Sequence, residues 1–226
     1  MQHSASAQKL AIAAVLATTA LVVIVGTVWG IRFLAATRTQ AATTQAANIA
    51  IGGFPMAGKL APDFTLTDQF NHPVALSSLR GHEVVLAFID SECKTLCPLT
   101  SNIMYAAKMQ LGSAAASQVD LVAVNANPDA TSVEAVQAWS IAHGMLNQWS
   151  FLTGSAQQLN TIYHAYDVYV QAKSADTAVH DPITFIIDAQ GHERLYYETL
   201  SSNAQADLTS EEDGMVAGMR QWLPGT

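Results

Sequence analysis

The chain contains two cysteines, Cys93 and Cys97, in the segment FIDSECKTLCPLTS. Three residues separate them, and Pro98 follows the second cysteine directly. Proline is favoured in the first turn of a helix, because its missing N–H would have no partner there. Backbone N–H groups and the helix dipole at such an N-terminus favour thiolate over thiol. The spacing therefore predicts two reactive sulfurs on one face at the start of a helix.

A structural disulfide is disfavoured for Cys93 and Cys97, because closing so short a loop gains little entropy. Two kinds of chemistry remain open. The first is thiol–disulfide exchange, although the usual redox spacing is C-x-x-C, one residue shorter. The second is a soft metal site, since thiolates select Cu(I) or Zn. The metal interpretation requires a third ligand.

The best candidate for that ligand is His180, in the segment TAVHDPITFIID. It precedes a strand that we expect beside the strand carrying the cysteine loop, at the end of the sheet where loops gather. Two thiolates and one imidazole suit Cu(I), and Cu(II) can add an oxygen ligand. Zn(II) with an open fourth position is the rival. For the other histidines a solvated or core role is favoured: His3, His72, His82, His143, His164 and His192.

The hydrophobic pattern predicts the elements that position these residues. A hairpin is expected around the turn 69–72, followed by a continuous apolar strand over 83–90. The elements expected after it are a helix (99–111), a strand (119–126), two helices (130–144 and 155–166), three strands (167–171, 182–188 and 193–199) and a final helix (208–223). This order predicts an α/β sandwich of the thioredoxin type, with the last two strands as an antiparallel edge. Thr209 and Glu212 have the spacing of a capping box for the final helix.

The N-terminal region predicts a membrane anchor. Residues 10–31 carry no ionisable side chain, and about 20 apolar residues suffice to cross a bilayer as a helix. A cleavable signal peptide usually has a shorter apolar core. We expect a short tail (1–9), an uncleaved transmembrane helix (10–31), a flexible linker (32–59) and one domain (60–226). Cleavage near residues 35–42 is the alternative.

The charge distribution argues against nucleic acid as a partner. Residues 1–40 contain three basic residues and no acidic ones, which leaves seven basic against eighteen acidic residues, a formal charge of −11. An acidic domain without a basic run is a poor ligand for nucleic acid. Charges flanking the predicted span are nearly balanced and lean toward a cytoplasmic domain. A tail of nine residues gives that count little weight.

Taken together, these features resemble the Sco/SenC family, which combines a membrane anchor, a thioredoxin-like domain, a C-x-x-x-C-P motif and a distant histidine ahead of a strand. The matching pieces are CKTLCP at 93–98 and His180 ahead of FIID at 185–188. The segments APDFTLTDQFNHPVALSSLRGHEVVLAF and FLTGSAQQL also look like parts of that family's domain. The resemblance covers residues 52–199.

The resemblance implies copper as the cargo, as Cu(I) with Cu(II) as a second state, bound by Cys93, Cys97 and His180. It implies a metallochaperone that delivers copper to the CuA centre of a respiratory haem–copper oxidase, or primes the cysteines of that centre. Subunit II of the oxidase is then the partner, with other copper chaperones or thiol reductants upstream. The implied location is a bacterial inner membrane, with one pass and the domain in the periplasm.

Two departures from the family pattern raise an alternative without removing the copper role. Lys94 follows the first cysteine where the family commonly has proline, and Pro182 stands where thioredoxin-type oxidoreductases keep a cis-proline. The alternative is a periplasmic thiol–disulfide reductase, with Cys93 as nucleophile and Cys97 as resolving cysteine. A copper or redox sensor is a third hypothesis. Peroxidase chemistry is disfavoured because Asp90 occupies the position of the peroxiredoxin threonine.

Other side chains near the motif leave two interpretations open. The carboxylates of Asp90, Glu92 and Asp181 either support the site from outside or lie solvated in loops. The apolar spacing of Met104 and Met109 favours core packing over copper ligation. The tyrosines expected to pack rather than react are Tyr163, Tyr166 and Tyr169.

Overall fold

The computed structural model describes residues 53–225 with the exception of 172–178, 181–182 and 200–204. The predicted tail, the predicted membrane span and most of the predicted linker lie outside these residues. In the described part, no helix is both long and apolar enough to cross a bilayer. Residues 48–226 form one compact unit.

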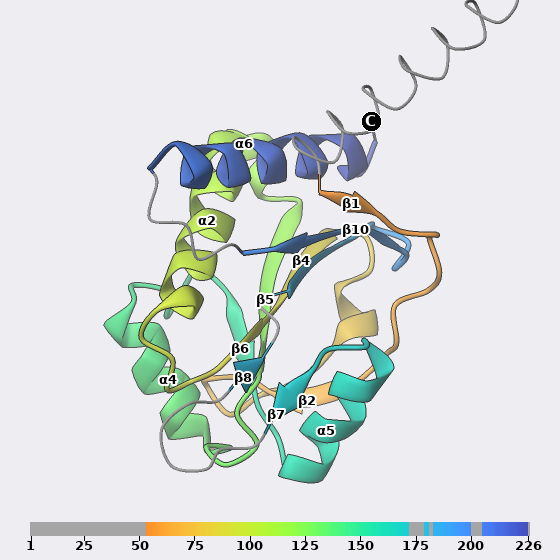
Figure 1. Cartoon of the computed structure of the whole chain (residues 1–226). Helices are drawn as coiled ribbons and strands as arrows, with labels where there is room; N and C mark the ends of the chain where they lie inside the picture. The colour runs from red at the N-terminus through yellow and green to blue at the C-terminus, as the bar shows by residue number, and fades with distance from the viewer. Residues whose placement is uncertain (1–52, 172–178, 181–182, 200–204, 226) are drawn as a thin grey trace, which may run out of the picture. The chain divides into compact units, whose positions relative to one another are not determined.

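A six-stranded mixed sheet forms the centre of this unit (Figure 1). In spatial order its strands are β1 (Phe54–Pro55), β10 (Glu193–Glu198), β9 (Ile183–Ile187), β4 (Glu83–Ile89), β5 (Val119–Asn125) and β6 (Ser150–Leu152). β4, β5 and β6 run parallel, whereas β9 is antiparallel to both β4 and β10. Every residue of β4 is buried, as expected for a strand covered on both faces.

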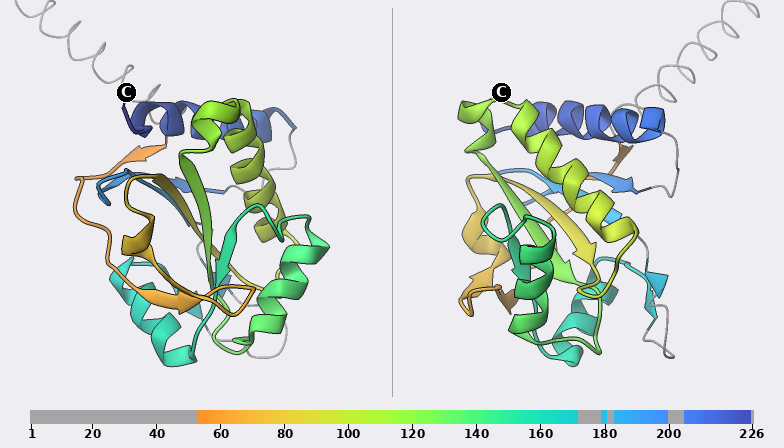
Figure 2. Two further views of the ribbon diagram at one scale, coloured as in Figure 1. Left: turned by 180° about the vertical axis from the view of Figure 1, so that it is seen from behind. Right: turned by 90° about the vertical axis from the view of Figure 1, so that its left-hand side faces the viewer.

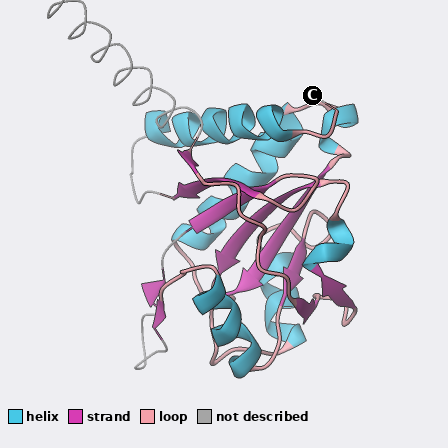
Figure 3. Cartoon of the chain, turned by 90° about the vertical axis from the view of Figure 1, so that its right-hand side faces the viewer, coloured by secondary structure: helices cyan, strands magenta, loops and turns pink. Residues whose placement is uncertain are grey.

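Helices cover both faces of the sheet and enclose two hydrophobic cores. One face carries α2 (Leu96–Gln110), α4 (Val133–Ala142) and α6 (Gln205–Trp222). In the right-hand view of Figure 2, α2 and α4 lie in front of the sheet and α6 crosses its upper end. The other face carries α5 (Ala156–Ala165), the β2–β3 hairpin (Thr65–Thr67 with Pro73–Ala75) and the 3-10 turn η1 (Leu76–Leu79). Figure 3 shows the strands between these helical layers.

Two short elements complete the fold. The helix α3 (Ser113–Ala116) connects α2 to β5, and a two-stranded hairpin pairs β7 (Val170–Gln171) with β8 (Val179–His180). β9 starts at the end of the sheet where β4 finishes, because the two strands run antiparallel. Figure 1 and the right-hand view of Figure 2 place the β7–β8 hairpin and the first turn of α2 at this same end.

The predicted α/β sandwich is confirmed, with three corrections. β10 is not an edge strand, because the two residues of β1 pair along its outer side. β6 was not predicted, since three residues between two helices give too short a pattern to identify a strand. The capping box is also wrong. α6 starts at Gln205, so Thr209 and Glu212 lie inside the helix, and Glu212 instead accepts a hydrogen bond from Gln110 of α2.

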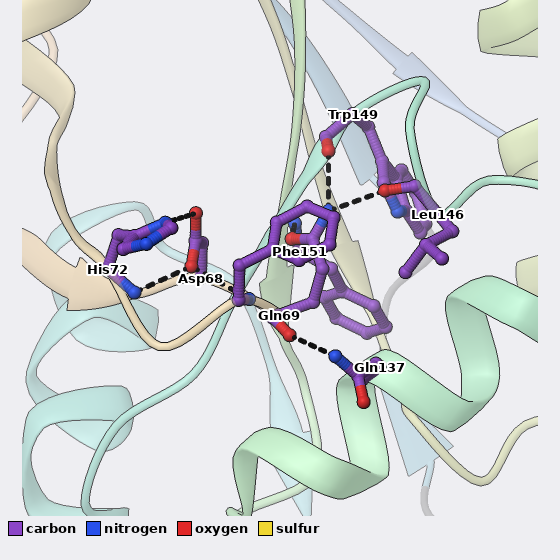
Figure 4. Close-up of polar contacts among 8 residues, drawn as sticks. Asp68, Gln69, His72, Gln137, Leu146, Trp149 and Phe151 are labelled. Atoms are coloured by element: carbon purple, nitrogen blue, oxygen red, sulfur yellow. Dashed lines mark hydrogen bonds and ion pairs between the residues drawn. The ribbon is translucent and has the colours of Figure 1, made fainter.

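The β2–β3 hairpin is fastened to the sheet by a buried side chain, Gln69, which is 1% exposed. Its Nε2 donates to the carbonyls of Leu146 (2.9 Å) and Trp149 (2.8 Å), and its Oε1 accepts from the N–H of Phe151 (2.8 Å) (Figure 4). Gln137 of α4 donates to the Gln69 carbonyl. One glutamine thus satisfies three backbone groups of the segment leading into β6.

Candidate functional site

The cysteine loop connects β4 to α2 and has the geometry that the spacing predicts. α2 starts at Leu96, so Cys97 and Pro98 both lie in its first turn. The N-cap residue, Thr95, makes no side-chain capping bond. Instead, the N–H of Cys97 points to the Sγ of Cys93 at 3.5 Å. The Cys93 sulfur therefore accepts one of the N–H groups that a helix start leaves without an intrahelical partner.

The two cysteines are thiols, not a disulfide, and they differ in their access to solvent. Cys93 is half-buried, whereas Cys97 is 1% exposed and belongs to the core under α2. The pKa of the Cys97 thiol is raised well above its usual range, first by its side-chain hydrogen bond to Cys93 and then by burial. Cys97 therefore holds its proton more tightly than an ordinary cysteine does. Because Cys93 is the more exposed of the two, it is the sulfur that can react first.

The structure brings the backbone of His180 to the end of the sheet that carries the cysteines. His180 pairs with Val170 in the β7–β8 hairpin, and β9 starts three residues later beside β4. The prediction that the strand after His180 lies beside the strand carrying the cysteine loop is thus confirmed. The side chain of His180 lies outside the described part of the structure, as do Asp181 and Pro182. The ligand assignment and the cis-proline hypothesis stay predictions.

Asp90, one of the candidate supporting carboxylates, is a buried residue rather than a solvated one. It is 3% exposed, and its Oδ1 accepts from the N–H of Glu92 at 2.8 Å and from the side-chain amide of Asn127 at 2.8 Å. The exposed Glu92 accepts from the same amide at 3.2 Å. Both carboxylates therefore hold the loop in shape.

Two residues of the site region were not identified from the sequence. Asn127 follows β5, and Trp139 of α4 donates from its Nε1 to the carbonyl of Cys93 at 3.1 Å. Both are distant from the cysteines in sequence and carry no motif. The one available signal was that Asn127, like Asp90, follows the carboxyl end of a parallel strand, where site residues gather.

The predictions for methionine and tyrosine are confirmed except at the exposed positions. Met104 is fully buried, but Met109 is 55% exposed and lies outside the core. Tyr163 and Tyr166 are buried and donate to the carbonyls of Asn125 and Pro62. The remaining tyrosine, Tyr169, is 54% exposed and does not pack as predicted.

The donor set fits a soft metal ion. Two thiols close together at a helix start can each release a proton and bind Cu(I), which prefers thiolate ligands. Among the side chains that the structure describes, no group of three or more His, Cys, Asp or Glu could hold a metal ion.

Comparisons with known proteins agree with this arrangement. The SCO1/SenC family model matches residues 55–211. A comparison with curated protein sequences gave no match. Similar solved structures include ScoI of Arabidopsis thaliana with copper bound (TM-score 0.61, 22% identity, 73% of this chain and all of that chain covered). BsSco, described as a member of the Sco family of cytochrome c oxidase assembly proteins with a disulfide switch, is also similar (TM-score 0.56, 19% identity, 73% and 98% covered).

A third similar structure is the thioredoxin domain of a thiol–disulfide oxidoreductase from Bacteroides vulgatus (TM-score 0.52, 14% identity, 74% and 98% covered). At these identities the structures establish the fold alone, which is thioredoxin-like as predicted. The match of the family model extends from β1 into α6 and includes the cysteine loop. The chain belongs to the SCO1/SenC family.

Proposed function

We propose that this chain binds copper and delivers it to the CuA centre of a haem–copper oxidase, or primes the cysteines of that centre. Family membership supports the copper role, as do the copper bound to the similar ScoI of Arabidopsis thaliana and the oxidase-assembly description of BsSco. The observation that carries the proposal is the pair of thiols at the start of α2, one half-buried and one buried, with the N–H of Cys97 pointing to the Sγ of Cys93.

In this proposal the copper ligands are Cys93, Cys97 and His180. Binding releases the thiol protons, so affinity for copper falls at low pH. Because Cys97 is buried, an incoming partner thiol reaches the copper on the side of Cys93, and transfer proceeds by exchange of ligands there. The membrane anchor at residues 10–31, the periplasmic location and subunit II as partner belong to the same proposal. They are supported by the sequence pattern and the family.

The test is a competition titration of the reduced protein with Cu(I) against a chelator of known affinity. We expect one tightly held copper per chain. His180→Ala should weaken binding by more than the 10–100-fold that loss of an outer partner costs, because a ligand itself is removed. His164→Ala is the matched control, since His164 is exposed on α5 on the other face of the sheet. Equal affinity of His180→Ala and wild type would refute the ligand assignment.

A second candidate function is thiol–disulfide reduction by the same cysteines. It is favoured by the accessible Cys93 beside the buried Cys97, and by the fold shared with the Bacteroides oxidoreductase domain. Cys93 would attack a partner disulfide and Cys97 would resolve the mixed disulfide. His180→Ala separates the two functions, because it should leave this exchange largely intact. Weak copper binding that is unaffected by the substitution would favour the reductase.

A further inference from the structure

A buried polar layer lies directly beneath the cysteine loop. It is formed where the parallel strands β4, β5 and β6 end, and each of its side chains is at most 8% exposed. Its members are Asp90, Ser91, Asn125, Asn127 and Thr153. Buried polar groups are costly unless hydrogen-bonded, so a layer of this kind fixes one arrangement of the loops above it.

Asn127 is the member of this layer that connects to the cysteine loop. Its amide nitrogen lies 2.8 Å from the Oδ1 of Asp90 and 3.2 Å from the Oε2 of Glu92. Its Oδ1 accepts from the backbone N–H groups of Asp129 (3.0 Å) and Ala130 (3.2 Å). Both ends of the amide thus have matching partners, which sets its orientation. The amide joins the loop after β5 to both carboxylates before Cys93.

Asp90 transmits this attachment to Cys93. Its carbonyl accepts from the N–H of Cys93 at 3.0 Å. Its carboxylate, held by Asn127, also accepts from the N–H of Glu92. A movement of Asp90 would therefore displace the backbone of Cys93, whose sulfur faces the N–H of Cys97.

Trp139 holds the same loop from the side of α4. Its indole N–H donates to the carbonyl of Cys93 at 3.1 Å, and the ring is 5% exposed. The ring is itself fixed by stacking on Trp149 (centroids 5.5 Å apart) and by an edge contact with Phe151 (5.7 Å). Cys93 is thus attached to the sheet through Asp90 and to α4 through Trp139.

On the basis of the copper-binding function proposed above, we propose that Asn127 and Trp139 are positioning residues for the copper site. Neither needs to touch the metal. Together these two residues, which we call the clamp, hold Cys93 against the first turn of α2. Both sulfurs are then presented at one point before copper arrives. Residues that orient ligands from outside typically contribute 10–100-fold to metal affinity.

The experiment compares Asn127→Ala and Trp139→Phe with wild type in the full-length protein. Trp139→Phe keeps an aromatic ring and removes the indole N–H, so it tests the clamp independently if Asn127→Ala folds poorly. Tyr166→Phe is the control, because it removes the hydrogen bond from a buried hydroxyl to the Pro62 carbonyl on the other face of the sheet, away from the cysteine loop. Cu(I) affinity should fall 10–100-fold in each clamp variant and stay unchanged in the control.

A second readout requires no copper. In the reduced protein, iodoacetamide should modify the half-buried Cys93 first and the buried Cys97 slowly. Loss of a buried hydrogen bond opens the loop more often, so modification of Cys97 relative to Cys93 should rise about tenfold in both clamp variants. Tyr166→Phe should leave the ratio unchanged, because its loss of stability is not local to the loop.

The two readouts separate this proposal from the proposed function. If wild type fails to bind copper, the copper function is wrong, while the modification ratio still decides whether the clamp exists. Wild-type ratios in both clamp variants, or a change no larger than that of Tyr166→Phe, would overturn the positioning role. A raised ratio combined with unchanged copper affinity would also overturn it, because the clamp would then not serve the metal site.

Discussion

Glu83 should make the stability of this protein fall as the pH rises, and replacing it should abolish that dependence. Glu83 is the first residue of β4 and is fully buried. Neither of its carboxyl oxygens has a hydrogen-bond partner in the described part of the structure. Burial, and secondarily the negative charge of Asp188, raises its pKa from 4.5 to about 9. The folded protein therefore holds Glu83 as the neutral acid at pH 7.

The magnitude follows from linkage between protonation and folding. In the unfolded chain the carboxyl ionises near pH 4.5, whereas the folded state keeps it protonated until about pH 9. Stability is therefore fully present below the unfolded pKa and is lost as the pH rises through the folded pKa. Each pH unit in that window costs about 1.4 kcal/mol. At pH 7 the free energy of unfolding is lowered by about 3 kcal/mol relative to an uncharged side chain.

Glu83→Gln is the matched substitution, because an amide has nearly the same shape and does not ionise. The variant and wild type should have similar stability near pH 4. The variant should be more stable by about 3 kcal/mol at pH 7, and by more at pH 8. The assay is urea unfolding of residues 48–226, followed by tryptophan fluorescence at several pH values. A constant difference between the two proteins across this range would refute the raised pKa.

Two further substitutions test the packing around the sheet. Gln69→Leu should lower the free energy of unfolding by about 3 kcal/mol, because three backbone groups lose their partners. Gln137→Ala, which removes only a partly exposed bond, should cost less than about 1 kcal/mol in the same denaturant titration. Gly218→Ala should destabilise by about 1–3 kcal/mol although alanine is the better helix former, because its methyl group would overlap the Tyr197 hydroxyl. Tyr197→Phe in that background should restore part of the lost melting temperature, and no rescue would show that the clash is elsewhere.

Local signals in the sequence were sufficient for most of the fold and for the reactive pair. β4 and β5 each contain a continuous apolar run, at 84–89 and 121–124, because both faces of these strands are buried. Ser155 is the N-cap of α5 and forms a capping box with Gln158, three residues along the chain. Cys97 and Pro98 mark the first turn of α2 because a proline there sacrifices no hydrogen bond. Each of these signals acts between residues close together in the chain.

The features that the sequence did not reveal depend on contacts between distant segments. β1 and β6 are short and exist because a neighbouring strand offers free N–H and C=O groups. The start of α6 was misplaced, since the spacing of Thr209 and Glu212 matches a capping box equally well inside a helix.

The candidate copper site likewise combines features set by local sequence with features set by tertiary contacts. The types and spacing of Cys93 and Cys97 determined which chemistry is available. The predicted strand order indicated that His180 precedes the strand beside β4. Only the tertiary structure decided that Cys97 is buried while Cys93 is accessible. It also decided that Asn127 and Trp139, 34 and 46 residues beyond Cys93 in the chain, hold the loop. Hydrogen bonds across such distances depend on how strands and helices pack, and no local pattern encodes them.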